Sequence, residues 1–334
     1  MAPYGGQDWV RCPVVGIPRR LVDVVRSGFV EGHHLGSVVA LTSGGTRDWS
    51  IGDVESPIYP RSCNKPLQAS AMLRLGLELP DELVALASAS HSGEPFHIEG
   101  VRRILASAGL DECALRTPVD YPLDDEARTA VIASGQAAAQ VMMNCSGKHA
   151  AMVATCVVNG WPIDSYLDPD HPLQASIAQT FTELTAEPIA STGVDGCGAP
   201  LFATSLTGLA RAFHTLVTAR PGSSERRVAD AIAAHPTYVS GTRRDEAALL
   251  SSIPGAIAKA GAESCYALAL PDGRAVALKI DDGSNRARPV VMAAALRRMG
   301  VHHGSGVDAD ALNATGYAPV MGGGRPVGEL RPTL

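Results

Sequence analysis

The order of strand-like and helix-like segments is the sequence feature that most constrains the fold. Near the amino-terminal end, short β-branched runs are divided by glycine, histidine and proline, which is the usual pattern of successive strands. These runs cover residues 24–30, 35–42 and 48–59. Near the other end, residues 264–270 and 275–280 flank Pro271-Asp272-Gly273, a sequence typical of the turn in a β-hairpin. Both ends of the chain therefore supply strands to the fold.

The residues between these strands have the composition and spacing of helices. Ala, Leu and Met are frequent there, and the predicted helices cover residues 65–77, 83–89, 98–109, 171–184, 206–219 and 224–234. The Ala-rich stretch 131–160 predicts two helices broken near Asn144, and residues 286–299 predict a last helix. We therefore expect an α+β layered fold, in which an antiparallel sheet of N- and C-terminal strands carries an inserted helical cluster.

Length and composition favour one large domain. The chain has 334 residues, of which 46% are hydrophobic and 19% are charged, so a sizeable core is expected. No linker or low-complexity segment interrupts it. We expect a single domain over residues 20–330, with a sheet part at about 20–60 and 255–330 and a helical part at about 61–254. The tail 321–334 is rich in glycine and proline, and we expect it to be partly mobile.

Charge and hydropathy exclude several classes of partner. The net charge of -6 argues against nucleic acid, because proteins that bind it usually carry a basic face. The first residues lack the basic stretch and apolar core of a secretory signal, and no apolar run is long enough to cross a bilayer. The seven cysteines are odd in number and widely spread, unlike a disulfide scaffold. We expect a cytoplasmic protein whose cysteines are core residues or metal ligands.

The first candidate site is the sequence Arg61-Ser62-Cys63-Asn64-Lys65. If a helix begins here, Ser62 and Lys65 are three residues apart and share a helical face. A lysine amine in that position can accept the serine proton when its surroundings favour the neutral amine, and the helix N-terminus stabilises negative charge near the serine. The same pattern also fits a serine helix cap followed by a surface lysine.

A second candidate is the run of small polar residues that follows an apolar segment at 89–95. Ser90 fits a second nucleophile or a proton relay, because loops that follow rigid elements often carry catalytic groups. Ser92 and Glu94 are candidates to hold the carboxylate or ammonium group of a substrate, and His91 lies between the two serines. The alternative is a helix C-terminus that ends in a glycine turn.

Two cysteines in small-residue turns form a third candidate. Cys145 and Lys148 are one helical turn apart, and Cys197 lies between two glycines. Two thiolates are plausible zinc ligands. A lysine ligand is unusual because the amine must be neutral, so His149 or Asp195 would be more conventional choices. Structural thiols are the alternative.

The fourth candidate is Lys259, which lies among small and apolar residues before a predicted strand. A lysine in such surroundings can be a buried base. It can equally be a solvated lysine at a helix end, and Lys279 in an alternating segment has the same ambiguity.

Taken together, the motifs RSxxKP, ASHSGE, NCSGKH, DPDHP, DGC and AKAGAE, in this order, resemble the bacterial L-asparaginase family of the Rhizobium type. The resemblance covers roughly residues 25–325. It implies a fold related to the serine β-lactamases and glutaminases, a layered α/β sandwich. It also implies hydrolysis of L-asparagine to L-aspartate and ammonia through an acyl-enzyme, in a homodimer.

The resemblance also assigns roles to individual residues. It implies catalytic pairs Ser62 with Lys65 and Ser90 with Lys259. It implies a zinc site at Cys145, Lys148 and Cys197, and it therefore favours Lys148 over His149 as the third ligand. The predicted substrate-binding residues are Arg61, His91, Ser92, Glu94 and Asp195.

Two other functions stay open at the level of sequence. A glutaminase, or another serine-type amidase of the β-lactamase kind, is the nearest alternative, because asparagine and glutamine differ by one methylene, worth about 1–3 kcal/mol of discrimination. A non-enzymatic protein stabilised by a metal is the other, although both lysine partners of the serines are present.

Overall fold

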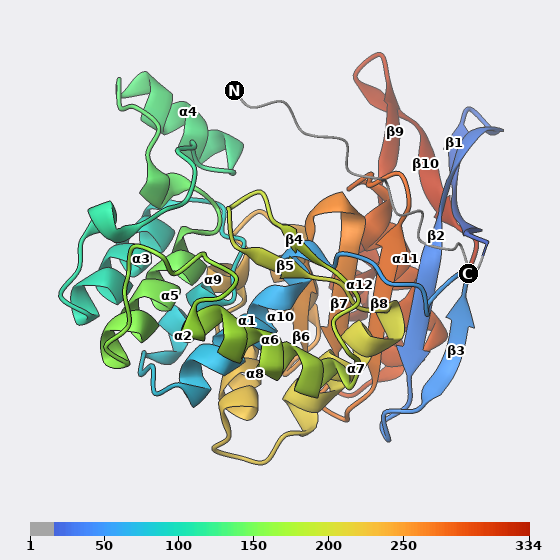
Figure 1. Ribbon diagram of the computed structural model, residues 1–334. Coiled ribbons are helices and arrows are strands. Elements are labelled where there is room, and N and C mark those ends of the chain that lie inside the picture. Colours follow the sequence, from blue (N-terminus) through green and yellow to red (C-terminus); the bar gives the residue numbers. More distant parts are fainter. Residues whose placement is uncertain (1–16) are drawn as a thin grey trace, which may run out of the picture.

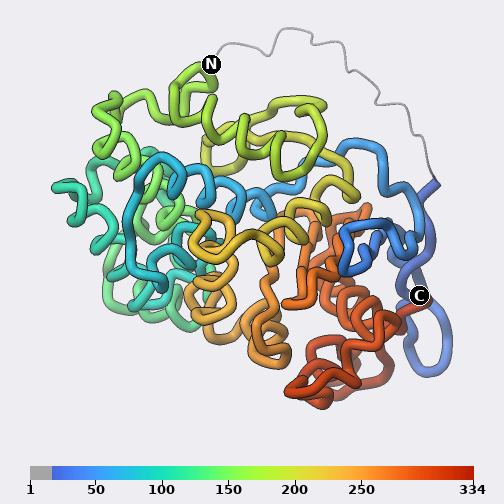
Figure 2. The backbone as a smooth tube through the Cα atoms, turned by 90° about the horizontal axis from the view of Figure 1, so that it is seen from below, coloured from blue at the N-terminus to red at the C-terminus, as the bar shows by residue number. Residues whose placement is uncertain are grey.

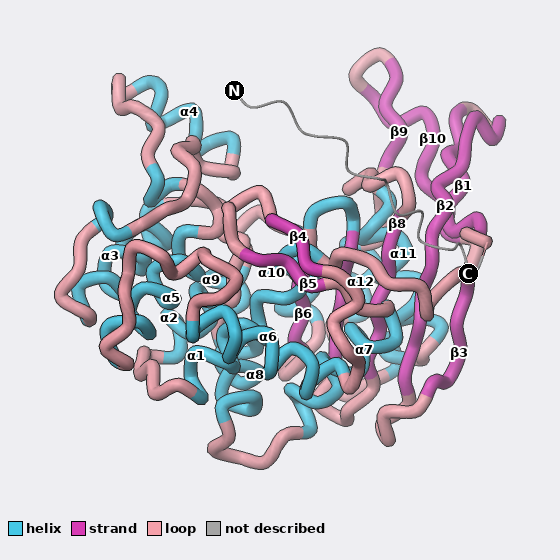
Figure 3. The backbone as a smooth tube through the Cα atoms, in the orientation of Figure 1, coloured by secondary structure: helices cyan, strands magenta, loops and turns pink. Residues whose placement is uncertain are grey.

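The computed structural model describes residues 17–334 and consists of a sheet beside a cluster of helices (Figure 1). The strands are β1 (Arg19–Arg26), β2 (Phe29–Leu41), β3 (Arg47–Ile51), β4 (Thr192–Val194), β5 (Pro200–Phe202), β6 (Ile257–Ala260), β7 (Cys265–Ala269), β8 (Ala275–Ile280), β9 (Pro319–Gly322) and β10 (Arg325–Pro332). β4 and β5 form a separate hairpin, which lies between the helices and the large sheet (Figure 3).

The large sheet joins strands from both ends of the chain. Its order is β6-β7-β8-β2-β1-β10-β9, and β3 pairs with β2 off this path. All of these pairs are antiparallel. The C-terminal end of the chain lies beside the N-terminal strands (Figure 2), where Thr333 N donates to Leu21 O at 2.9 Å. The expected α+β fold, with an antiparallel sheet built from both ends, is therefore confirmed.

The helices fill the sequence between β3 and β6 and the connection after β8. They are α1 (Lys65–Arg74), α2 (Asp81–Ala87), α3 (Pro95–Ser107), α4 (Asp125–Ala133), α5 (Ser146–Val158), α6 (Pro172–Thr185), α7 (Leu206–Thr218), α8 (Ser224–Ala234), α9 (Pro236–Val239), α10 (Asp245–Ser252), α11 (Ala287–Arg298) and α12 (Ala309–Thr315). The prediction of two helices within 131–160 is only partly met, because α5 lies there but α4 ends at Ala133 and no α-helix covers residues 134–145. Within residues 17–334, no helix is both long and apolar enough to cross a membrane.

The tail is ordered by strand pairing, so the expectation of partial mobility was wrong. β10 pairs with β1, and β9 pairs with β10. The two glycines that suggested mobility, Gly323 and Gly324, form the turn of this hairpin, where their φ angles are 56° and 76°. Glycine reaches such angles at little steric cost, so here it marks a tight turn.

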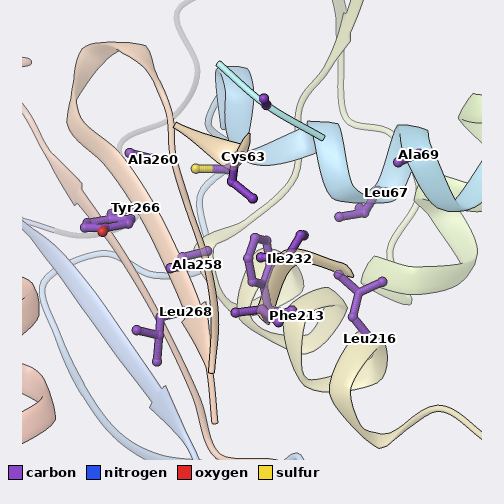
Figure 4. Packing of buried hydrophobic residues seen from close by; sticks show 14 of the residues in the cluster. Cys63, Leu67, Ala69, Phe213, Leu216, Ile232, Ala258, Ala260, Tyr266 and Leu268 are labelled. Atoms are coloured by element: carbon purple, nitrogen blue, oxygen red, sulfur yellow. The ribbon is translucent and has the colours of Figure 1, made fainter. Parts of the chain in front are cut away.

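The core joins the helical cluster to the sheet at the edge strand β6 (Figure 4). Phe213 and Leu216 of α7 and Ile232 of α8 belong to the same buried cluster as Ala258 of β6 and Leu67 of α1. Burial of such side chains stabilises a fold by about 1.5–3 kcal/mol each. This packing fixes the start of α1 against the end of β6.

A single glycine tests the register of the central strands. A Cβ atom added to Gly36 of β2 would lie 2.2 Å from the carbonyl oxygen of Lys279 in β8, whereas one added to Gly32 of the same strand would meet no atom within 4 Å. We expect Gly36→Ala to lower the free energy of unfolding by about 1–3 kcal/mol, because the strands must separate. Denaturant unfolding measures it, with Gly32→Ala as control. Equal stability of the two variants would contradict this register.

Candidate active site

The sequence-predicted residues come from five segments that meet where the helical cluster reaches β6. Ser62 lies in a 3₁₀ turn, Arg61–Asn64, which leads directly into α1. Ser90 lies in the loop between α2 and α3, and Cys145 precedes α5. Cys197 follows β4, and Lys259 belongs to β6. The pairing of β6 as an edge strand leaves one side of it free for the helices.

Lys65 connects three of these segments. Its side chain is fully buried, with a relative exposure of 1%. Its Nζ donates hydrogen bonds to Ala89 O at 2.5 Å, to Ser90 Oγ at 3.0 Å and to Cys145 Sγ at 3.1 Å. A buried ammonium group needs such partners, because its desolvation is costly without them. Lys65 thus joins the start of α1 to the second serine and to the thiol cluster.

Ser62 differs from Ser90 in having a free hydroxyl. It is half-buried, and no hydrogen bond of its hydroxyl is found within the described part of the chain. The preceding Arg61 adopts a φ of 52°, a left-handed conformation that costs about 1 kcal/mol or more in a non-glycine residue. Such strain accumulates at functional sites, where the surrounding structure holds it.

Lys259 is paired differently from the expectation. Its Nζ donates to Glu246 Oε1 and to Ala260 O, both at 2.8 Å, whereas Ser90 accepts from Lys65. The physical reason is charge: both Lys259 and Glu246 are completely buried, and a buried cation is most stable beside a buried anion. The expected pair of Ser90 and Lys259 is therefore replaced by Ser90 with Lys65 and Lys259 with Glu246.

Burial and neighbouring charges shift the pKa values of Lys259 and Glu246. Burial lowers the pKa of Lys259, and the Lys65 ammonium acts in the same direction, against the opposing effect of Glu246. Although burial opposes the charge of Glu246, Lys259 and Arg244 hold its pKa down at about 2. Glu246 is thus an anion throughout the physiological range. Lys259 loses its proton more readily than an exposed lysine does.

The loop at 90–94 is tied to the protein more firmly than its sequence indicated. His91 Nδ1 accepts from Gly93 N at 3.1 Å, so the proton of this ring lies on Nε2, which donates to Ser146 Oγ at 2.9 Å. Burial lowers the pKa of His91 well below its usual value. Ser92 is likewise buried. The carboxylate of Glu94 accepts from the Thr242 backbone N–H at 2.9 Å and from its hydroxyl at 2.7 Å.

Arg61 and Asp195 form an ion pair across the site. Arg61 Nε donates to Asp195 Oδ1 at 2.8 Å, and both side chains are largely buried. The same carboxylate oxygen accepts from Gly196 N at 2.8 Å. Asp195 therefore links the residue before Ser62 to the turn that carries Cys197.

Cys145, Lys148 and Cys197 lie together, as expected. Lys148 Nζ donates to Cys197 Sγ at 3.2 Å, and all three side chains are buried. A hydrogen bond from the Cys145 thiol lowers the pKa of Cys197, with further help from the Lys148 ammonium. The pKa of Cys145 is raised well above its usual value by the same hydrogen bond and by burial. Cys197 is therefore the thiolate of this cluster.

Charge on the thiolate also affects Lys148. Burial opposes its ammonium form, but Cys197, Cys145 and Asp195 together raise the pKa of Lys148. His149 lies next to this cluster, and its Nδ1 is hydrogen-bonded to the Tyr166 hydroxyl at 2.7 Å. Burial lowers the pKa of His149 to about 4.

Sequence reasoning missed Glu246 and Thr242. Glu246 lies in the first turn of α10. An acidic residue in that position is usually explained by its favourable interaction with the positive end of the helix dipole. Glu246 and Lys259 are thirteen residues apart and lie in different elements, so no local spacing in the sequence pairs them. Thr242 gave no signal, because a threonine between a glycine and two arginines looks like part of a solvated loop.

Several solved structures match the fold with low sequence identity. A β-lactamase from Mycobacterium bovis matches with a TM-score of 0.44 and 15% identity, over 79% of this chain and 94% of that chain. The hydrolase EstCE1, with promiscuous acyltransferase activity, matches with a TM-score of 0.40 and 13% identity, over 77% and 92%. SurE with D-Leu matches with a TM-score of 0.37 and 13% identity, over 81% and 72%. At these scores the similarities assign no shared function.

Family membership is settled by the sequence itself. Residues 22–332 match the L-asparaginase II family, so the chain belongs to this family. Asparagine hydrolysis is the family's function, and the expectation of an asparaginase, an amidohydrolase with a small-molecule substrate, is confirmed. Among curated proteins none matches the chain significantly.

The buried pair of Lys259 and Glu246 can be tested by stability. Glu246→Gln keeps the shape of the side chain but leaves the Lys259 charge without its anion. We expect it to lower the free energy of unfolding by about 3–5 kcal/mol. Urea unfolding measures the change, and the exposed Glu329→Gln, expected to shift stability by at most about 0.5 kcal/mol, is the control. A loss as small as the control's would contradict a charged, buried pair.

Proposed function

We propose that the chain hydrolyses L-asparagine by attack of Ser62, with Lys65 and Ser90 as the proton relay. The observation that carries the proposal is the 3.0 Å hydrogen bond between Lys65 Nζ and Ser90 Oγ. Lys65 also lies three residues after Ser62, whose hydroxyl has no partner within the described residues. Ser90 is buried and already hydrogen-bonded, whereas Ser62 is half-buried beside an open cavity that Arg61 lines. Ser62 is therefore the hydroxyl that a substrate can reach more easily.

The proposed reaction has two steps. The step requires Lys65 as a neutral amine, so its ammonium form must first release a proton to solvent. Ser62 Oγ then attacks the carbonyl carbon of the side-chain amide, and its proton passes to the Lys65 amine, directly or through Ser90. The proton then goes to the departing nitrogen, so that ammonia leaves and a β-aspartyl ester of Ser62 forms. Water attacks the ester in the second step, gives its proton to the same relay, and releases L-aspartate with the hydroxyl of Ser62 restored.

The surroundings of Ser62 favour a developing negative charge. Ser62 lies at the entry to α1, where the helix N-terminus carries partial positive charge and would stabilise an oxyanion. The end of β6 also approaches closely: a Cβ on Gly261 would lie 2.5 Å from Pro60 O and 3.3 Å from Ser62 N. A glycine at 261 therefore allows this strand to reach the nucleophile.

Removal of the nucleophile is the direct test of this assignment. Ser62→Ala should lower kcat for L-asparagine at least about 10³-fold, as removal of a catalytic serine does in other hydrolases. Its melting curve should stay that of the wild type, because the hydroxyl holds no other group. Ammonia release is the assay, and Ser176→Ala, on the exposed face of α6, is the control. Near-wild-type turnover by Ser62→Ala would remove Ser62 from the mechanism.

We further propose that Cys145, Lys148 and Cys197 hold a zinc ion. The donor set fits once Lys148 and both thiols give up their protons to the metal's charge, because two buried sulfurs and a nitrogen converge there and thiolates suit this borderline-soft cation. Within residues 17–334, no group of three or more His, Cys, Asp and Glu side chains is arranged to hold a metal, so the lysine amine would complete the set. When bound, zinc supplies a positive charge and a Lewis-acid centre. The residues themselves would shape the pocket and help to position the substrate.

The zinc proposal predicts a metal content that depends on one thiol. Protein loaded with zinc and then desalted should retain it stoichiometrically, and Cys145→Ala should not, as elemental analysis would show. Cys113→Ala, which removes an exposed thiol, is the control and should retain zinc. Chelation should raise KM for L-asparagine more than it lowers kcat. Loaded wild-type protein without metal would contradict the proposal.

The homodimer and the cytoplasmic location remain proposals. The dimer rests on the resemblance to the family, and the location on the seven widely spread cysteines, which favour a reducing compartment. A single-chain mass of 34.7 kDa in light scattering would contradict the dimer.

A further inference from the structure

A cavity of about 590 Å³ lies beside the proposed nucleophile. Its wall is formed by Tyr59 and Arg61, by the hairpin of β4 and β5, and by Glu263 and Lys279 at one end of the sheet. Arg61 directly precedes Ser62, and consecutive Cα atoms are only about 3.8 Å apart. The cavity therefore reaches the residue next to Ser62, although Ser62 itself is not among its lining residues.

Two opposite charges face this cavity without neutralising each other. The carboxylate of Glu263 is exposed and forms no ion pair within the described residues, whereas Arg61 is already paired with Asp195. Lys279 Nζ donates to Ile280 O at 2.5 Å and forms no ion pair within the described residues, although its charge acts on the nearby Asp281 carboxylate. The cavity thus offers one anion and one cation to a ligand.

The position of Glu263 is fixed by its surroundings. Its φ of 56° is left-handed, as is the φ of 52° at Ser264. Ser264 Oγ donates to Gly283 O at 3.1 Å, and a Cβ on Gly283 would lie 2.5 Å from Glu263 Oε2. The glycine at 283 therefore leaves room for this carboxylate. A group held in a strained conformation by its neighbours is preorganised to bind.

We propose that Glu263 binds the α-ammonium group of the substrate and Lys279 binds its α-carboxylate. L-asparagine carries both charges at one end and its amide at the other, so the charged end would lie in the cavity while the amide reaches Ser62. Glu94, an earlier candidate for this role, already has its carboxylate occupied by Thr242. This inference deepens the proposed function and rests on the amide being attacked at Ser62.

Substrate analogues separate the two contacts. Succinamic acid lacks the ammonium group and 3-aminopropanamide lacks the carboxylate, and each is measured as an inhibitor of asparagine hydrolysis. Glu263→Gln should raise KM for L-asparagine about tenfold or more, as expected for loss of a charge-assisted hydrogen bond, and leave the Ki of succinamic acid unchanged. Lys279→Met should raise the same KM and leave the Ki of 3-aminopropanamide unchanged.

Each result has a clear reading. Glu329→Gln, which removes an exposed charge elsewhere, is the control, and melting curves confirm that the variants fold. An unchanged KM for L-asparagine in either variant overturns the role of that residue. Equal weakening of L-asparagine and of the matched analogue overturns it as well. Because the Ki values of the analogues are binding constants, they stay decisive even if Ser62→Ala shows that another residue is the nucleophile.

Discussion

The burial of three lysine side chains in one small region is the constraint on which the site depends. Lys65, Lys148 and Lys259 are each at most 1% exposed. Ammonium groups cannot stay in a protein interior without partners. Each lysine has different hydrogen-bond partners. Lys259 donates to the Glu246 carboxylate and Lys148 to the Cys197 sulfur. Lys65 donates to the carbonyl of Ala89, the hydroxyl of Ser90 and the sulfur of Cys145. Catalytic chemistry and structural stability therefore share the same contacts.

This arrangement explains why the site lies at the junction of sheet and helices. Lys259 comes from the edge strand β6, and Lys65 comes from the first turn of α1, which packs beside it. Cys63 Sγ donates to Lys259 O at 3.0 Å, so the serine turn is attached directly to the strand. The two lysines are close enough that the charge of Lys65 lowers the pKa of Lys259. A shift of either element would disturb both amines.

Much of the fold could be predicted from the sequence, because its signals are local. The turn Pro271-Asp272-Gly273 gave the hairpin of β7 and β8, and helical spacing gave most of the helices. The N-terminal strands were placed less well, because the predicted strand 24–30 crosses the turn at Ser27 and Gly28 between β1 and β2. The C-terminal hairpin was missed because Gly323 and Gly324 look alike in a tight turn and in a mobile tail. The pairing within the site was also out of reach. Spacing placed Ser62 three residues before Lys65, but only tertiary packing decides that Lys65 meets Ser90 and that Lys259 meets Glu246.

The most direct test of the account is to trap the acyl-enzyme on the wild-type chain. Rapid acid quenching during turnover of L-asparagine, followed by digestion and mass spectrometry of the peptides, locates the β-aspartyl group. The account predicts the adduct on the peptide that contains Ser62, and no adduct on the peptide that contains Ser90. An adduct on Ser90, with Ser62 unmodified, would contradict the central claim that Lys65 and Ser90 serve Ser62 as its proton relay.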